Sequence, residues 1–173
     1  MNNTFAAQCR IDTPIGPMTL AATNSGLAGA WFDAQAHHPG VLHASVDGRQ
    51  RWLAQAAREL AEYFAGQRSS FSVPLDPRGT AFQISVWHAL QHIGCGQMRS
   101  YGAIAEEVAR PTAARAVGAA VGRNPISVIV PCHRVVGRDG ALTGYAGGLP
   151  RKQALLMLER AAQPKKPIQK VNA

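Results

Sequence analysis

The sequence ISVIVPCHRV, residues 126–135, places a cysteine directly after an apolar run and a proline. We predict a buried extended strand over Ile126–Val130 that ends at Pro131, because short apolar runs bounded by a breaker are typical of strands in a core. The end of such a strand is a rigid place from which to present a nucleophile, and His133 follows Cys132 in the chain. Cys132 is therefore a candidate nucleophile, and the alternative is an ordinary core cysteine.

Downstream, a glycine-rich loop at residues 137–148 leads into a last helix, predicted over Pro150–Arg160. Glu159 lies on this helix. Because Cys-His-acid sites use a carboxylate to orient the imidazole, Glu159 is a candidate partner of His133. Distance along the sequence does not show that the two meet.

Upstream, two short helices are predicted on either side of a break at residues 111–112. The first opens after the N-cap Ser100, and the second is the alanine-rich segment Ala113–Val121. Such a pair is typical of a helix-turn-helix, although small side chains equally suit ordinary helix packing. A longer helix before them begins at the N-cap Thr80 and ends at Gly94.

The first 79 residues predict a strand meander covered by one helix. The helix is expected over residues 50–65, followed by a linker rich in glycine, serine and proline at residues 66–79. The expected strands are Cys9–Asp12, Met18–Ala22 and Leu27–Phe32.

The predicted fold class is therefore α/β (α+β) in two domains. A small N-terminal sheet-and-helix domain with its linker takes residues 1–79. A mostly helical C-terminal domain takes residues 80–160 and carries the helix-turn-helix and the active-site cysteine loop. Residues 161–173 form a basic tail with the composition of a disordered segment.

Charge is distributed unevenly along the chain. Residues 1–98 hold six lysines and arginines against six acids, so the whole formal net charge of +8 comes from the C-terminal half. This asymmetry suggests a face that binds a polyanion, and the alternative is a solvated surface.

Composition also bears on location and cofactors. No apolar run reaches membrane-spanning length and no secretory signal is present, so we expect a cytoplasmic protein, nucleoid-associated if bacterial, with no membrane partner. Three widely spaced cysteines predict neither a disulfide framework nor a paired-cysteine metal site.

Five segments together resemble the O6-alkylguanine-DNA alkyltransferase family. Their order and spacing agree with the family without gaps from Tyr101 to Glu159, and the resemblance covers residues 80–160, whereas residues 1–79 fit by shape only. The segments are Ser100-Tyr101, AARAVG at 113–118, Asn124-Pro125, IVPCHRVV at 129–136 and GYAGGL at 144–149.

The resemblance implies a DNA repair protein that flips O6-alkylguanine out of duplex DNA and transfers the alkyl group irreversibly to Cys132. Each molecule would act once, because a thioether is chemically inert. The implied partner is double-stranded DNA that contains O6-alkylguanine. No cofactor, no metal and no obligate protein partner are implied, and the protein would be a monomer.

The resemblance also implies catalytic roles. His133, held by Glu159, would act through a water molecule as the base that makes Cys132 a thiolate. Asn124 would be a buried hinge between the helix-turn-helix and the active-site segment, and a plain turn asparagine is the alternative.

Base recognition would rest mostly on backbone groups. The carbonyls of Cys132 and Val135 would accept from the exocyclic amine, and the amide of Ala146 would donate to O6. The Tyr101 hydroxyl would contact N3. The Tyr145 ring would line the pocket beside the alkyl group. The alternative is that Tyr145 only packs against its neighbours.

On the DNA side, Arg115 would enter the minor groove and fill the space that the flipped base leaves, while Tyr101 crowds the adjacent phosphate. The alternative for Arg115 is a single phosphate contact. Small residues would let the second helix approach the groove closely: Ala113, Ala114, Ala116 and Gly118.

The sequence departs from some relatives. Cys95 stands where many members have proline, and we expect it to be incidental. Ala146 replaces a serine, which a backbone contact should tolerate. Cys9 with the nearby histidines supplies only one thiol for a zinc site, so no metal is assigned.

Two other functions remain open. A helix-turn-helix protein that binds DNA without chemistry explains the charge but not the setting of Cys132. A hydrolase that uses Cys132, His133 and Glu159 explains the thiol but not the basic helix pair.

Overall fold

The computed structural model describes residues 5–162. Its N-terminal half is a four-stranded sheet of order β3-β2-β1-β4, in which β1, β2 and β3 form an antiparallel meander and β4 pairs in parallel with β1. The strands are β1 (Ala7–Ile11), β2 (Met18–Ala22), β3 (Leu27–Phe32) and β4 (Ser45–Val46). The two predicted strands at β2 and β3 are confirmed, and β1 begins two residues earlier than expected.

Helix α1 (Arg51–Phe64) covers the sheet, as predicted. Its N-terminus is capped by Gln50, whose side chain accepts from the amides of Trp52 and Leu53. Because apolar residues recur every three or four positions, one face of the helix is buried against the strands.

The C-terminal half is mostly helical, so the predicted fold class is confirmed. The predicted caps are present: Thr80 forms a capping box with Gln83, and the Ser100 hydroxyl accepts from the Ala103 amide. The elements are α2 (Ala81–Gln91), β5 (Arg99–Ser100), α3 (Tyr101–Glu107), α4 (Ala114–Gly122), a 3₁₀ turn (Cys132–Arg134), β6 (Val135–Val136) and α5 (Leu149–Ala162). Helices α3 and α4 pack together where the helix-turn-helix was expected.

The strand predicted over Ile126–Val130 is wrong. The segment is buried but coiled into tight turns, with Val128 at φ +72° and a single bridge from Ile126 to Ala30. The side chain of Asn124 bonds the backbone of Ile126 and the carbonyl of Val130, which satisfies groups that a strand would have paired in a ladder. An apolar run indicates that a segment is buried but not which backbone conformation it adopts, and here the buried segment forms turns.

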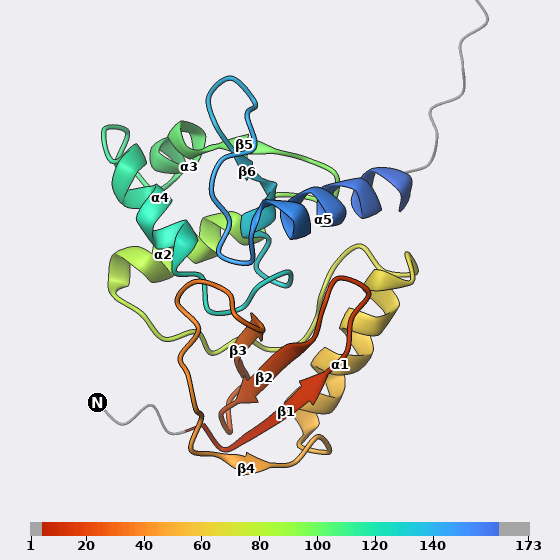
Figure 1. Cartoon of the computed structure of the whole chain (residues 1–173). Helices are drawn as coiled ribbons and strands as arrows, with labels where there is room; N and C mark the ends of the chain where they lie inside the picture. The colour runs from red at the N-terminus through yellow and green to blue at the C-terminus, as the bar shows by residue number, and fades with distance from the viewer. Residues whose placement is uncertain (1–4, 163–173) are drawn as a thin grey trace, which may run out of the picture.

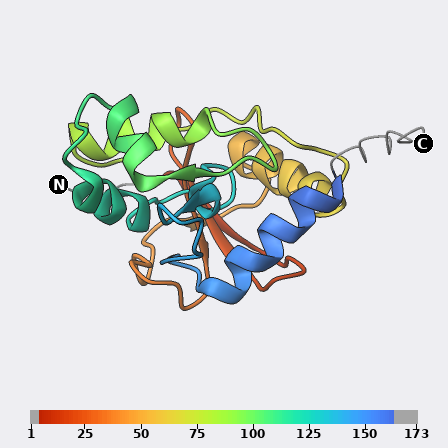
Figure 2. The same cartoon turned by 90° about the horizontal axis from the view of Figure 1, so that it is seen from above.

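The two halves share one continuous core, with the sheet and α1 in the lower part of Figure 1 and α2–α4 in the upper part. Strand β3 joins the active-site segment because the Ala30 amide donates to the Pro125 carbonyl and the Ser127 amide donates to that of Ala30. Seen from above, the segment at residues 124–136 runs through the centre of the molecule (Figure 2).

Residues 161 and 162 of the predicted tail belong to α5, and residues 163–173 lie outside the described part of the chain. Within residues 5–162, no helix is both long and apolar enough to cross a membrane.

Candidate active site

Cys132 is the first residue of the 3₁₀ turn and is buried, not presented by a strand. Its Sγ lies 3.0 Å from the Nδ2 of Asn124. Burial raises the pKa of the Cys132 thiol to about 11, against the opposing effects of the Asn124 hydrogen bond and the charge of Lys152. The resting thiol is therefore protonated at neutral pH and needs a base to become a nucleophile.

His133 and Glu159 meet, as hypothesised from the sequence. Nε2 of His133 lies 2.8 Å from Oε1 of Glu159, and both side chains are fully buried. Burial lowers the pKa of His133 despite the nearby carboxylate, so the imidazole is neutral. The Glu159 carboxylate can only accept a hydrogen bond, so Nε2 of His133 is the donor and carries the proton. The lone pair of the neutral imidazole is therefore on Nδ1. Nδ1 is buried without a hydrogen-bond partner among the described residues.

Arg134 completes a buried ion pair with Glu159. Its guanidinium donates to both carboxylate oxygens at 2.8–3.1 Å and to the Ile93 carbonyl. Burial alone would raise the pKa of Glu159, but hydrogen bonds from His133 and Arg134 hold it well below the ordinary range. Glu159 is thus ionised at neutral pH.

Two further groups on Glu159 come from distant parts of the chain. The Tyr63 hydroxyl of α1 donates to Oε1 at 2.8 Å, and the Gly96 amide donates to Oε2 at 3.0 Å. None of the roles of Arg134, Tyr63 and Gly96 was predicted from the sequence. The available signal was a tyrosine on the buried face of α1, because a buried hydroxyl needs a partner.

Lys152 is the other functional candidate that was not predicted from the sequence. It is fully buried on α5, and its Nζ donates to the carbonyls of Val135 at 2.6 Å, Thr143 at 2.7 Å and Gly144 at 3.3 Å. Burial lowers the pKa of Lys152, and the charge of Cys132 acts in the opposite direction. Among residues 5–162 the hydrogen-bond partners of this ammonium are carbonyl oxygens, so it gains a counter-charge when Cys132 ionises.

Asn124 links α4 to the active-site segment. It is 3 % exposed and bonds the Val130 carbonyl at 2.8 Å as well as the thiol of Cys132. These bonds fix the Asn124 side chain within the segment that carries Cys132, and its role as a hinge stays a prediction.

A cavity of about 160 Å³ lies against Cys132. It brings together the predicted residues Tyr101, Tyr145 and Ala146, whereas the Val135 carbonyl already accepts from Lys152. The Tyr145 hydroxyl is buried and has no hydrogen-bond partner among the described residues. The lining consists of Ala36, His37, Tyr101, Gly118, Val121, Gly122, Cys132, Gly144, Tyr145 and Ala146.

Comparison with known proteins decides the family. Residues 81–161 match the family model described as 6-O-methylguanine DNA methyltransferase, DNA binding domain, and residues 10–77 match its ribonuclease-like domain. The chain belongs to the 6-O-methylguanine DNA methyltransferase family. The resemblance inferred from the sequence is confirmed.

One solved structure and two sequence relatives agree with this. The crystal structure of Mycobacterium tuberculosis OGT in complex with DNA is 49% identical, with a TM-score of 0.85 over 91% of this chain and 95% of that one. The methylated-DNA–protein-cysteine methyltransferase of Mycobacterium bovis is 50% identical over 89% of this chain and 92% of its own. The protein of the same name from Methanosarcina acetivorans is 48% identical over 86% of this chain and 94% of its own.

The helix pair of this methyltransferase family member holds the residues that were predicted to contact DNA. Arg115 and Ala116 are exposed on α4, while Ala113, Ala114 and Gly118 are half-buried. Arg134 and Lys152 are buried, so two of the cations counted toward a basic face are unavailable to DNA.

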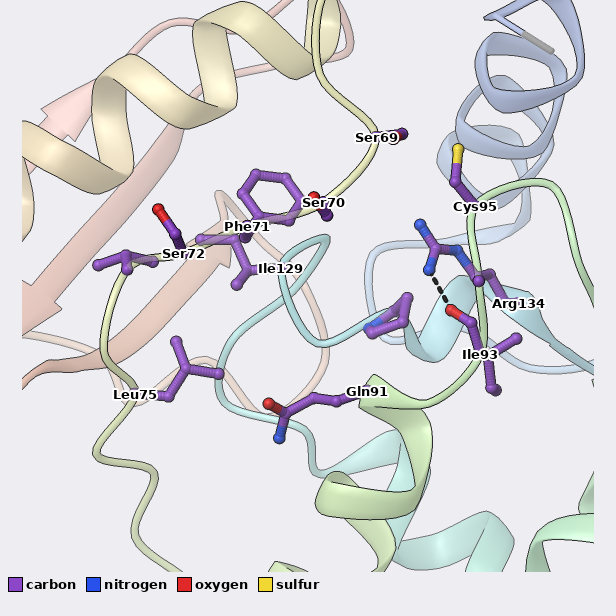
Figure 3. Close-up of a pocket in the computed structure, with 13 residues that line it drawn as sticks. Ser69, Ser70, Phe71, Ser72, Leu75, Gln91, Ile93, Cys95, Ile129 and Arg134 are labelled. Carbon is purple, nitrogen blue, oxygen red and sulfur yellow. Dashed lines mark hydrogen bonds between the residues drawn. The ribbon is translucent and has the colours of Figure 1, made fainter. Parts of the chain in front are cut away.

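A second cavity, of about 240 Å³, has Arg134 among its lining residues (Figure 3). Arg134 and Cys95 face it from one side, and Phe71 and Ile129 face it from the other. Burial and the Glu159 charge raise the pKa of Cys95, which disfavours its thiolate. Among residues 5–162 there is no cluster of three or more histidine, cysteine or acidic side chains able to hold a metal ion.

Proposed function

We propose that this protein repairs DNA by transferring the alkyl group of O6-alkylguanine to its own Cys132. The observation that carries the proposal is a buried thiol at a cavity, followed in the chain by a neutral imidazole whose proton is fixed on Nε2 by Glu159. Membership of the family and the DNA complex of a relative support duplex DNA as the partner.

In the proposed reaction, a water molecule relays the thiol proton to Nδ1 of His133. Sγ of Cys132 then attacks the alkyl carbon, the S–C bond forms, and the C–O6 bond breaks with its electrons passing to guanine. The departing guanine anion takes up a proton from water while its N3 accepts a hydrogen bond from the Tyr101 hydroxyl, and the imidazolium of His133 returns the thiol proton to water. Overall, thiol and O6-alkylguanine give thioether and guanine.

Charge balance supports this sequence of steps. Lys152 offsets the thiolate as it forms, and Glu159 offsets the imidazolium. The thioether product is neutral and inert, so the proposal implies one turnover per molecule.

The target base must leave the duplex to reach the cavity, at a cost of a few kcal/mol of stacking and pairing. We propose that Arg115 stabilises the flipped state from the exposed face of α4. The amide of Ala146 would hold O6. The carbonyls of Cys132 and Val135 would recognise the exocyclic amine, with the second lone pair of the Val135 oxygen accepting this bond beside the one from Lys152.

The direct test is the intact mass of the protein after incubation with O6-methylguanine duplex DNA. We expect a gain of a single methyl group that peptide mapping assigns to Cys132. Turnover of many substrates per protein would instead indicate a hydrolase-like enzyme. A label on Cys9 or Cys95 would remove Cys132 from the proposed role.

Arg115→Ala is expected to slow transfer from a duplex at saturating DNA by about tenfold or more. Flipping costs a few kcal/mol, and a loss of only about 1.4 kcal/mol of the stabilisation that offsets this cost changes the rate tenfold. Inactivation by the free base O6-benzylguanine, which needs no flipping, should change little. Single-turnover rates for wild type, Arg115→Lys and Arg115→Ala measure this. Equal saturated duplex rates for all three would show that Arg115 makes only a phosphate contact.

A further inference from the structure

One wall of the Cys132 cavity comes from the N-terminal half of the chain. Ala36 and His37 lie in the segment Asp33–His38, the wall segment, which follows β3. Every other lining residue lies between positions 101 and 146. The N-terminal half therefore borders the site at which the alkyl group is transferred.

The wall segment is tied to the loop that carries Tyr145. The Ala36 amide donates to the Ala146 carbonyl at 2.9 Å. The Ala146 amide is proposed to donate to O6 of the base. Because Ala36 is bonded to the same residue, it lies next to the place where the O6 substituent would be.

Hydrogen bonds of the buried Gln35 side chain fix the wall segment to its neighbours. Gln35 is 6 % exposed, and its Oε1 accepts from the Phe32 amide at 2.8 Å and from the Ser127 hydroxyl at 3.1 Å. Ser127 belongs to the buried segment at residues 124–136, which also carries Cys132. The wall is thus anchored to both flanks of the cavity.

The backbone of the wall segment is strained where it meets the cavity. Ala34 and His37 have φ values of +57° and +60°, a region that residues with a Cβ seldom adopt. Such conformations persist only where surrounding contacts impose them, and here the Gln35 and Ala36 hydrogen bonds do so. The positions of the Ala36 and His37 side chains are therefore set by the fold.

We propose that the wall segment selects among O6-alkyl substituents by size, with Ala36 and His37 as specificity-determining residues that favour small groups. The inference rests on the proposed alkyl transfer. The cavity of about 160 Å³ is smaller than the roughly 300–1,000 Å³ of pockets for drug-sized ligands, so it suits a base with a short substituent. A larger group would press on this wall.

The test compares single-turnover transfer from duplexes that contain O6-methylguanine or O6-benzylguanine. His37→Ala enlarges the cavity mouth and should raise the benzyl-to-methyl rate ratio by about fivefold or more. Ala36→Leu narrows it and should lower the ratio by about tenfold, the scale of one or two methylenes in a pocket. Both side chains are exposed, so folding should be retained, and thermal melting checks this.

His43→Ala is the matched control, because His43 is exposed and does not line the cavity. Its rate ratio should stay within twofold of wild type. Ratios unchanged in both His37→Ala and Ala36→Leu would overturn the proposal. A wild-type protein that accepts neither alkyl group would instead contradict the transfer function itself, so the two failures are distinguishable.

Discussion

Cys132→Ser is expected to bind O6-methylguanine duplex DNA as wild type does and to accept no methyl group. A serine hydroxyl ionises far less readily than a thiol, and the site already raises the pKa of Cys132 to about 11 by burial. The neutral His133 could not take a proton from so weak an acid. The measurement pairs a binding isotherm with intact mass after prolonged incubation.

The matched controls for this variant are Cys9→Ser and Cys95→Ser. Both cysteines lie outside the Cys132 cavity, so each variant should accept one methyl group at the wild-type rate. Methyl transfer to Cys132→Ser, or its loss in Cys95→Ser, would mean that the acceptor has been misassigned. Loss of DNA binding by Cys132→Ser would show that the thiol contributes to binding as well as to chemistry.

Glu159→Gln is expected to reduce both stability and transfer. Removing one partner of a buried ion pair leaves Arg134 charged and unpaired, which costs about 3–5 kcal/mol. For a chain of this size that corresponds to a fall in Tm of roughly 6–20 °C. Transfer should slow by about 10²-fold, since His133 loses the carboxylate that fixes its tautomer and offsets its charge.

The pH dependence of this stability difference has a defined sign. The pKa of Glu159 is lowered in the folded protein, so its contribution is complete above the ordinary glutamate value of 4.5 and is lost as pH falls below that value. The gap in Tm between wild type and Glu159→Gln should therefore be constant near neutrality and shrink in acid. A gap that widens as pH falls would contradict the assignment.

Glu59→Gln separates structural from catalytic loss. Glu59 is also fully buried, but it accepts from the amides of Ser72 and Val73 and lies outside the His133 cluster. This variant should lower Tm while leaving the saturated transfer rate unchanged. If both glutamine variants lost transfer in proportion to stability, Glu159 would be a structural residue only.

Local signals in the sequence determined the secondary structure well. The caps at Thr80 and Ser100 sit next to the helices they start. Short apolar runs separated by turn clusters located β2 and β3, and helically spaced apolar residues located α1. These signals succeed because capping and amphipathicity act over a few residues. The residues around Cys132 likewise indicate the family by their identity and order along the chain.

Contacts between distant residues were decided only by the tertiary structure. Glu159 meets Tyr63 across 96 positions in the chain, and a lysine that composition assigns to a basic surface is buried under the active-site loop as Lys152. The apolar run Ile126–Val130 became a turn because Asn124 could satisfy its backbone. Hydropathy records which residues avoid water, whereas the partners of a buried charge or carbonyl depend on which elements the fold brings together.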